Sequence, residues 1–374
     1  MPGPCRRLCG ASVTVPSPWH RTDGERRPGP YAASVATDAL PAVASVGGRL
    51  ATGLRDVTSD TAALDSTGFW VVVLLYDGDP ICARFEHTRP TVGSPRRRWH
   101  GPRRDAWATS LDHDEFTAGV AAIREAIADG DVYEVNLTRR LSAPLPPDAD
   151  VLALANALAG GNPAPHAAVV RLPAHGVHVA SASPERFLRR DGRHVMSQPI
   201  KGTAAHASQF LAKDRAENVM IVDLVRNDLG RVCEYGSIEV PGLCDVEHHP
   251  GLVHLVSTVT GTLRAEVGWP ALLDATFPPG SVTGAPKLAA MEVIGRLEPV
   301  PRGPYCGAIG WVDADRRVGD LNVAIRTFWF DDGAVHLGTG GAITWDSDPD
   351  GEWEETELKA RRLLRVASAD MVGT

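Results

Sequence analysis

The stretch from Phe69 to Tyr76, FWVVVLLY, is the longest apolar run in the chain of 374 residues. Its length fits a strand buried on both faces and falls far short of a membrane span, so no membrane partner is expected. Other segments with strand-like composition lie at residues 80–87, 132–141, 167–172, 177–182, 305–312, 322–330 and 334–340. The segments 167–172 and 177–182 are separated by a short turn, which predicts a hairpin.

Helical patterns are interspersed among the later strands. Residues 111–131 begin with a capping-box pattern, Asp112 followed by Glu115, and their apolar side chains then fall on one helical face. Those apolar residues are Phe116, Val120, Ile123 and Ile127. Residues 213–233 and 352–367 also have helical patterns. Strands that dominate early, with helices mixed in later, indicate an α+β fold.

The composition is that of a globular protein without a nucleic-acid partner. Hydrophobic residues make up 43% and charged residues 22% of the chain, with a formal net charge of −8. Nucleic-acid binding usually requires a basic face, and a net negative field repels anionic substrates, so a site for an anion must carry its own cations. The six cysteines form no CxxC pair and the first residues lack a continuous apolar core. Together these features predict reduced thiols and a cytoplasmic protein.

Lys201 lies between a proline and a glycine in the stretch Ser197–His206, SQPIKGTAAH. Pro199 restricts the backbone and Gly202 permits a close backbone approach, so the pattern can hold an amine at a fixed place. A solvated lysine in a surface turn fits the same stretch. The local sequence leaves both interpretations open.

Two acidic pairs lie on the predicted helices, Asp214 with Glu217 and Glu352 with Glu355. A spacing of three places both carboxylates of a pair on one helical face. Four such carboxylates, if they converged, would suit a hard cation such as Mg²⁺. The alternative is two solvated faces, with Glu355 and Lys359 forming an ordinary i,i+4 ion pair.

Several polar or flexible positions are weak signals when each is taken alone. His254 lies among apolar residues, and Ser281 lies in a loop rich in Gly and Pro that could hold an anion. Gly340 and Gly341 permit a close approach of backbone to a ligand. Arg326 lies in an apolar strand pattern, where a buried guanidinium requires an anionic partner.

Taken together and in chain order, eight segments resemble the chorismate-utilising enzymes over roughly residues 110–370. They are SPERF (183–187), PIKGT (199–203), KDRAENVMIVDLVRNDLGRVC (213–233), HLVSTVTGTL (254–263), FPPGSVTGAPK (277–287), YCGAIGW (305–311), AIRT (324–327) and EWEETELKA (352–360). The resemblance implies the fold of anthranilate synthase component I, which is α+β with two large packed β-sheets and helices outside. We then expect a disordered leader at residues 1–40, a β-rich N-terminal portion of the fold at 41–110 and a chorismate-binding catalytic portion at 111–374.

Within this family the resemblance is to component I of aminodeoxychorismate synthase, because that branch carries lysine where anthranilate synthases carry alanine. It implies that the Lys201 amine adds to C2 of chorismate as the C4 hydroxyl leaves, after which ammonia attacks C4 and expels the lysine. Such chemistry needs a neutral amine, and so a depressed lysine pKa. Glu185 matches the general acid, a role that favours a raised pKa. Glu134 stands where water-adding relatives carry lysine and ammonia-using relatives usually carry glutamine.

The resemblance also implies the other roles. Glu217 and Glu355 would bind Mg²⁺ directly, while Asp214 and Glu352 would hold its waters. The residues that would receive the substrate's carboxylates are Tyr305, Arg326, Lys359 and the backbone at Gly340, Gly341 and Ala342. Thr203, His254 and Ser281 would line the reacting ring. The family usually has a third glycine at position 342, so the Ala342 methyl group would matter if that residue needed a positive φ.

The expected reaction needs ammonia, which is scarce at neutral pH because almost all of it is ammonium. The resemblance implies a separate class I glutamine amidotransferase subunit as the source. Two alternatives remain: an anthranilate synthase component I, and a catalytically silent regulatory subunit with the same fold. The lysine argues against the first, and the retained acid, lysine and carboxylates argue against the second.

Overall fold

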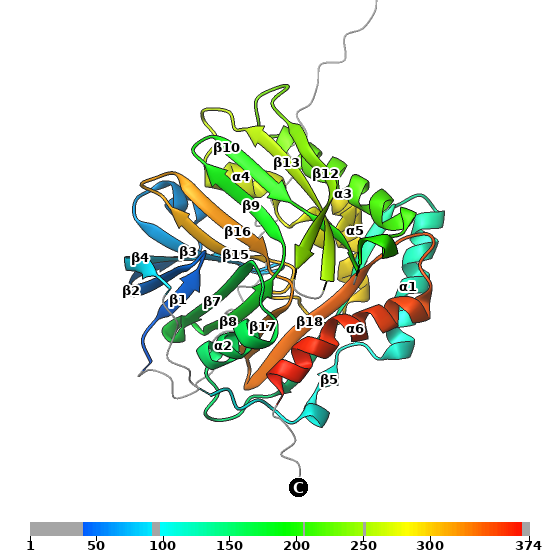
Figure 1. Ribbon diagram of the computed structural model, residues 1–374, viewed down its shortest axis with the longest axis horizontal. Coiled ribbons are helices and arrows are strands. Elements are labelled where there is room, and N and C mark those ends of the chain that lie inside the picture. Colours follow the sequence, from blue (N-terminus) through cyan, green and yellow to red (C-terminus); the bar gives the residue numbers. More distant parts are fainter. Residues whose placement is uncertain (1–39, 92–97, 205, 250–251, 369–374) are drawn as a thin grey trace, which may run out of the picture.

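The computed structural model describes residues 40–91, 98–204, 206–249 and 252–368 (Figure 1). The expected leader at residues 1–40 therefore lies outside the described residues, apart from its last residue. Among the described helices, none is long and apolar enough to cross a membrane.

The described strands form one continuous network of 18, all paired antiparallel, whose two long arms meet at a single strand and are called the first and second sheet. In the first sheet, neighbours follow the order β6 (Glu134–Pro144), β18 (Ala334–Ile343), β17 (Thr327–Asp331), β8 (Val177–Ser183), β7 (His166–Leu172), β1 (Val43–Val46) and β2 (Arg49–Thr58). In the second, the order is β3 (Phe69–Leu74), β15 (Ala308–Asp313), β16 (Val318–Val323), β9 (Arg186–Asp191), β10 (His194–Gln198), β13 (Leu252–Thr262) and β12 (Glu239–His249). Strand β4 (Ile81–Pro90) joins the sheets, since it pairs with both β2 and β3.

Three short strands add to these sheets. Strands β5 (Ala108–Thr109) and β14 (Gly284–Ala285) pair with β6, and β11 (Ile200–Ala204) pairs with β13. The α+β class and the large antiparallel sheets expected from the sequence are confirmed.

One cluster of buried side chains joins the two sheets. It includes Val46 and Val170 from the first sheet and Leu188 and Ile309 from the second. Strands before and after residue 110 alternate in the network, because β1 pairs with β7 and β3 pairs with β15. Segments before and after residue 110 therefore share this cluster, while two further clusters lie under helices α2 (Val151–Gly161) and α6 (Pro349–Ala367) and under helices α1 (His113–Ala128) and α5 (Lys287–Leu297).

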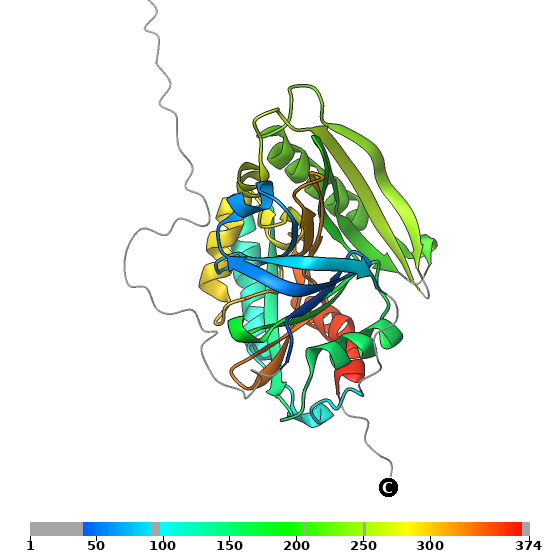
Figure 2. The ribbon, with the colours of Figure 1, turned by 90° about the vertical axis from the view of Figure 1, so that its left-hand side faces the viewer.

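Helices cover the sheets (Figures 1 and 2). Helices α2 and α6 pack on the first sheet, while α1 and α5 pack against β6. Helices α3 (Ala212–Gly230) and α4 (Trp269–Thr276) contribute to the cluster that joins the sheets, and α3 contacts β11 and β13. The capping box of Asp112 and Glu115 at the start of α1 is formed as predicted.

The strand expected at residues 322–330 is broken in two. β16 ends at Val323 and β17 begins at Thr327, and Arg326 in the gap has a φ of 51°. A left-handed residue cannot continue a β-ladder, so the apolar pattern concealed a turn at Arg326. The arginine lies at a strand end rather than within a strand.

Candidate active site

Lys201 lies on β11, where the two sheets approach each other, and its side chain is buried at 8% exposure. Gly202 has a φ of 82°, and a Cβ there would lie 3.2 Å from the Cβ of Asp214 on α3. The glycine thus lets the strand carrying the lysine run close to the helix, as its position in the sequence suggested. Burial of the amine excludes the solvated surface turn.

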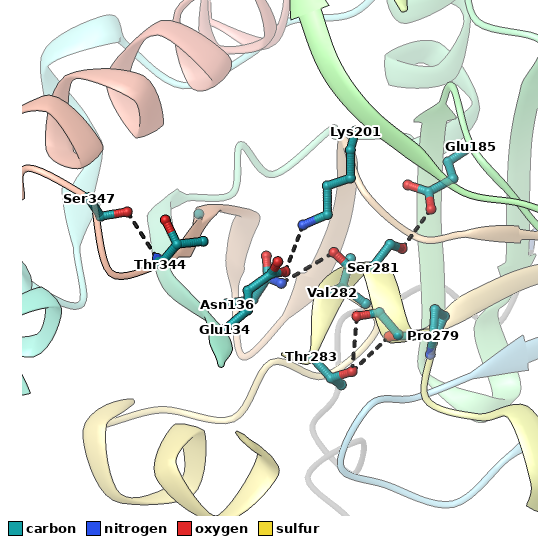
Figure 3. Close-up of polar contacts among 12 residues, drawn as sticks. Glu134, Asn136, Glu185, Lys201, Pro279, Ser281, Val282, Thr283, Thr344 and Ser347 are labelled. Carbon is teal, nitrogen blue, oxygen red and sulfur yellow. Dashed lines mark hydrogen bonds and ion pairs between the residues drawn. The ribbon is translucent and has the colours of Figure 1, made fainter. Parts of the chain in front are cut away.

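The buried amine points at a buried carboxylate (Figure 3). Lys201 Nζ donates a hydrogen bond of 2.8 Å to Oε1 of Glu134 on β6, a residue with no solvent exposure. Glu134 Oε2 has no hydrogen-bond partner among the described residues. The bond joins β11 of the second sheet to β6 of the first, so the site lies between the sheets.

The expected depression of the Lys201 pKa is not found. Burial alone would lower the pKa, but the negative charges of Glu134, Glu217 and Glu185 outweigh burial and raise it. The physical reason is the Glu134 carboxylate, whose contact with the amine the sequence pattern did not indicate. In this arrangement the resting lysine is an ammonium ion.

Glu185 connects β8 to β9 and is buried at 3% exposure. Burial raises the pKa of its carboxyl group from 4.5 to about 7, although a hydrogen bond from Ser281 and the charge of Lys201 oppose the rise. Ser281 Oγ donates that bond over 2.6 Å (Figure 3). A carboxyl group that is about half protonated at neutral pH fits the expected general acid.

Glu185 and Ser281 are among the residues that line a small, partly open cleft. The cleft continues beside α3, along Val225, Asp228 and Leu229. Glu185 lines this cleft, whereas Lys201 does not.

His254 and Thr203, both expected beside the reacting ring, are opposite each other in the pairing of β13 with β11. His254 is buried at 2% exposure. Since Thr203 is two residues from Lys201, the register brings both backbone positions close to the lysine. The structure therefore gathers Lys201, Glu185, Ser281, Thr203 and His254 in one region.

The four predicted metal ligands lie on helices α3 and α6, and the charge of Lys213 acts on carboxyl groups of both helices. Lys213 lowers the pKa of both Glu217 on α3 and Glu352 on α6, although burial dominates and raises both values, that of Glu217 to about 7. The pKa of Glu355 is lowered by Lys359 first and also by Lys213.

Three of the four predicted metal ligands already have a protein partner. Asp214 Oδ2 accepts from the backbone N–H of Leu211 at 2.7 Å, Ser347 Oγ donates to Glu352 Oε1 at 2.6 Å, and Lys359 pairs with Glu355 at 2.7 Å. Glu217 has no ion pair within the described ranges. No group of three or more His, Cys, Asp or Glu side chains in those ranges is gathered as a ready metal site.

The positions predicted to bind the substrate's carboxylates include Lys359 with strand β18, and Arg326 just before the start of β17. Lys359 Nζ contacts the carbonyl oxygen of Gly340 at 2.9 Å, and Gly341 and Ala342 follow on β18. Ala342 has no positive φ, so its methyl group causes no backbone strain. The partly buried Arg326 has no carboxylate partner in the described part of the chain, and burial lowers its pKa.

Tyr305 does not line the cleft at Glu185. Its ring lies against Gly338, where a Cβ would be 2.1 Å from the ring, and it lines a second cleft that shares no lining residue with the cleft at Glu185. The predicted contact of Tyr305 with substrate therefore has no direct support from the clefts.

The sequence analysis did not identify Arg302, which holds the loop of Ser281 in place. Arg302 is buried, donates to the carbonyl oxygens of Val282 and Asn136 at 2.8 and 2.9 Å, and forms an ion pair with Glu298 at 2.7 Å. Asn136 Nδ2 in turn donates to the Ser281 carbonyl oxygen at 3.2 Å. These bonds fix the Ser281 loop to β6, the strand that carries Glu134. No local pattern singles out an arginine that acts through backbone carbonyls.

Comparison with solved structures agrees with this architecture. Anthranilate synthase component I from Streptococcus pneumoniae superposes with a TM-score of 0.71 at 23% identity, over 92% of this chain and 96% of that one. The menaquinone-specific isochorismate synthase from Escherichia coli gives a TM-score of 0.71 at 18% identity, over 89% and 90% of the two chains. At these identities the likeness establishes the fold alone.

Sequence relatives are considerably closer. The aminodeoxychorismate synthase of Streptomyces pristinaespiralis is 48% identical over 66% of this chain, but the match spans only 35% of that relative's length. Aminodeoxychorismate synthase component 1 of Salmonella typhimurium is 36% identical over 83% of this chain and 73% of its own. Anthranilate synthase component 1 of Streptomyces coelicolor is 41% identical over 71% and 53%. The family model for chorismate binding enzymes matches residues 81–365, and with the Salmonella relative this shows that the chain belongs to the chorismate binding enzyme family.

Proposed function

We propose that this chain is component I of an aminodeoxychorismate synthase, which converts chorismate and ammonia into 4-amino-4-deoxychorismate. The observation that carries the proposal is the buried Lys201 amine beside Glu185, a buried carboxyl group with a pKa of about 7. A nucleophile and a protonated acid in one enclosed site suit the displacement of a hydroxyl group from a small ring. Relatives with this name at 48% and 36% identity support the same choice.

In the proposed reaction the Lys201 amine attacks C2 of the ring and the C4 hydroxyl leaves. Hydroxide is a poor leaving group, so Glu185 donates a proton and water departs. Ammonia then attacks C4, the ring double bonds shift back, and the C2–N bond breaks to release the lysine. Ser281 orients the Glu185 carboxyl group through its 2.6 Å hydrogen bond.

Local cations would receive the dianionic substrate despite the net charge of −8. Arg326, which has no carboxylate partner in the described ranges, is the strongest candidate for a substrate carboxylate. Lys359 and the backbone at Gly340, Gly341 and Ala342 would contribute on the side of β18. Thr203 and His254 would line the ring, and Tyr305 is the least supported contact.

The donor chemistry of the two acidic helices fits Mg²⁺. All four side chains offer oxygen, and burial raises the pKa of the partly buried Glu217 to about 7 even though the charges of Lys201 and Lys213 oppose the rise. Glu217 and Glu355 would hold the ion directly, and Asp214 and Glu352 would hold its waters. When bound, the ion would supply positive charge for a substrate carboxylate. Glu355 would have to share its carboxylate between the ion and Lys359.

The second candidate is an anthranilate synthase component I, which is favoured by the 41% identical Streptomyces coelicolor relative. That reaction aminates C2 and has no use for a buried nucleophilic amine. A silent regulatory subunit would have no reason to keep Glu185 protonated beside a buried lysine. The anthranilate synthase alternative leaves Lys201 without a role, and the silent subunit leaves both Lys201 and Glu185 without one.

One assay separates the three functions. The purified chain is incubated with chorismate, Mg²⁺ and ammonium, and the products are identified by mass and fluorescence. We expect a product with the mass of an aminated chorismate and no fluorescent anthranilate. Formation of anthranilate would favour the second candidate, and recovery of unchanged chorismate would favour the silent subunit.

The proposed reaction also requires a source of ammonia. We expect a class I glutamine amidotransferase subunit to deliver it, and the isolated chain to use ammonium salts but not glutamine. Turnover should increase with pH because only ammonia has a lone pair, until ionisation of Glu185, whose pKa is about 7, removes the general acid. Glutamine-dependent turnover by the isolated chain would exclude the need for a partner.

A further inference from the structure

The contact between Lys201 and Glu134 has a consequence for the proposed reaction. The Lys201 amine is held as ammonium by its carboxylate neighbours, yet an ammonium ion has no lone pair and cannot attack carbon. The proton must therefore leave before the attack, and the structure limits where it can go.

Glu134 is the acceptor with the right position. Its Oε1 is 2.8 Å from Nζ, both side chains are buried, and Oε2 is left without a partner among the described residues. The backbone of Glu134 is fixed on β6, where it pairs with Ala285 of β14. Other titratable groups that act on or adjoin Lys201 are Glu185, Glu217, Glu355 and His254.

We infer that Glu134 is the proton acceptor for Lys201, taking the Nζ proton when the amine attacks and returning it when the lysine is released. This inference rests on the proposed function. In the first step an N–H bond breaks, an O–H bond forms on Glu134, and the freed lone pair forms the N–C2 bond. When ammonia expels the lysine as a neutral amine, Glu134 returns the proton and the ion pair is restored. Glu185 separately supplies the proton that leaves with the C4 hydroxyl.

An internal acceptor has a signature that a purely structural residue lacks. The states before and after transfer carry the same number of protons, so the transfer itself does not depend on external pH. If Glu134 is replaced by glutamine, Lys201 must release its proton to solvent. The rate of attack then rises about tenfold per pH unit below the lysine pKa, which itself falls because the carboxylate is gone.

The test uses the full chain and the variant Glu134→Gln. Each is mixed with chorismate and Mg²⁺ without ammonia, and the lysine adduct is followed by mass spectrometry of the intact protein from pH 6 to pH 9. The ratio of variant to wild-type rate cancels the contribution of Glu185. We expect the ratio to rise with pH, about tenfold per unit at the acidic end, and a ratio independent of pH would overturn the inference.

A second measurement does not require chorismate turnover. The pH dependence of Lys201 acylation by acetic anhydride is read from the digested protein, with Lys287 as the internal reference. Lys287 forms a separate, partly buried ion pair with Asp228 at 2.6 Å. Glu134→Gln should speed labelling of Lys201 about tenfold or more at pH 7.5 and leave Lys287 unchanged.

The two readouts separate the possible failures. If the wild-type chain forms no adduct but Glu134→Gln speeds Lys201 labelling, the proposed function fails while the proton-sharing pair stands. If labelling of Lys201 has the same pH dependence in both proteins, the inference fails whatever the enzyme makes. Glu134→Asp is the charge-conserving control, because it keeps the carboxylate on a shorter side chain. It should show the wild-type pH dependence of labelling, and it remains a usable variant if Glu134→Gln proves unstable.

Discussion

Replacing Glu185 with glutamine should make the protein more stable at alkaline pH while abolishing turnover. Burial raises the pKa of this carboxyl group from 4.5 to about 7. A group whose folded pKa exceeds its unfolded pKa binds a proton more tightly in the folded state, so it costs stability as pH rises from the unfolded value toward the folded one. Above pH 7 the cost is complete.

The magnitude follows from the two pKa values. One pKa unit corresponds to about 1.4 kcal/mol, so ionising Glu185 costs the folded state about 3 kcal/mol at pH 8.5 and about 1 kcal/mol at pH 5. Glutamine has a similar shape, can still accept the Ser281 hydrogen bond, and does not ionise. The variant should therefore gain roughly 2–3 kcal/mol over wild type between pH 5 and pH 8.5.

Urea unfolding at pH 5, 7 and 8.5 measures this gain directly. Glu217 also has a pKa of about 7 and titrates in the same window, but it is present in both proteins and cancels in the difference. Parallel pH dependence of wild type and Glu185→Gln would refute the reasoning, because it would mean that Glu185 ionises in the folded state as easily as in the unfolded chain.

The remaining predictions concern turnover. Lys201→Ala should lose nearly all C4 amination, measured as product mass. Some C2-aminated product is expected, because the anthranilate branch carries alanine at this position. Unchanged C4 amination would remove the lysine from the mechanism. EDTA should abolish turnover and Mg²⁺ should restore it. The variants Glu217→Gln and Glu355→Gln should each need higher concentrations of Mg²⁺ and of chorismate to reach half-maximal turnover. Full activity in metal-free buffer would exclude a role for the ion. Arg326→Ala should raise KM for chorismate by about tenfold or more, the effect of losing one charge-assisted pair of about 1.5–3 kcal/mol, and an unchanged KM would place the substrate carboxylates elsewhere.

The parts of the fold that depend on local pattern could be predicted from the sequence. The apolar run at Phe69 became β3, the hairpin of β7 and β8 formed, and the capping box at Asp112 begins α1. Helix α2 was missed because its sequence, VLALANALAGG, is apolar nearly all round and shows no clear period. The break at Arg326 was missed because apolar residues continue through it, and only the backbone reveals the left-handed turn.

The site was predicted less completely, for a physical reason. The motifs identified Lys201 and Glu185, and the structure places both in one buried region. The charge state of the lysine, however, depends on Glu134, which is 67 residues away in sequence and belongs to the other sheet. A pKa is set by every charge within several ångströms, whatever its distance along the chain. The pattern around Lys201 therefore predicted the wrong direction for its pKa.

The charges around Lys201 also explain how such a site can accept a dianion. Three carboxyl groups, Glu134, Glu185 and Glu217, act on one buried amine, and all three as free anions would repel chorismate. Under the proposed function each is neutralised in a different way: Glu185 by its own proton, Glu134 by the lysine and Glu217 by Mg²⁺. Removing any one of these neutralising partners leaves a buried negative charge facing the substrate. Weak chorismate binding is thus expected at high pH, where Glu185 ionises, and in metal-free buffer, where Glu217 is unpaired.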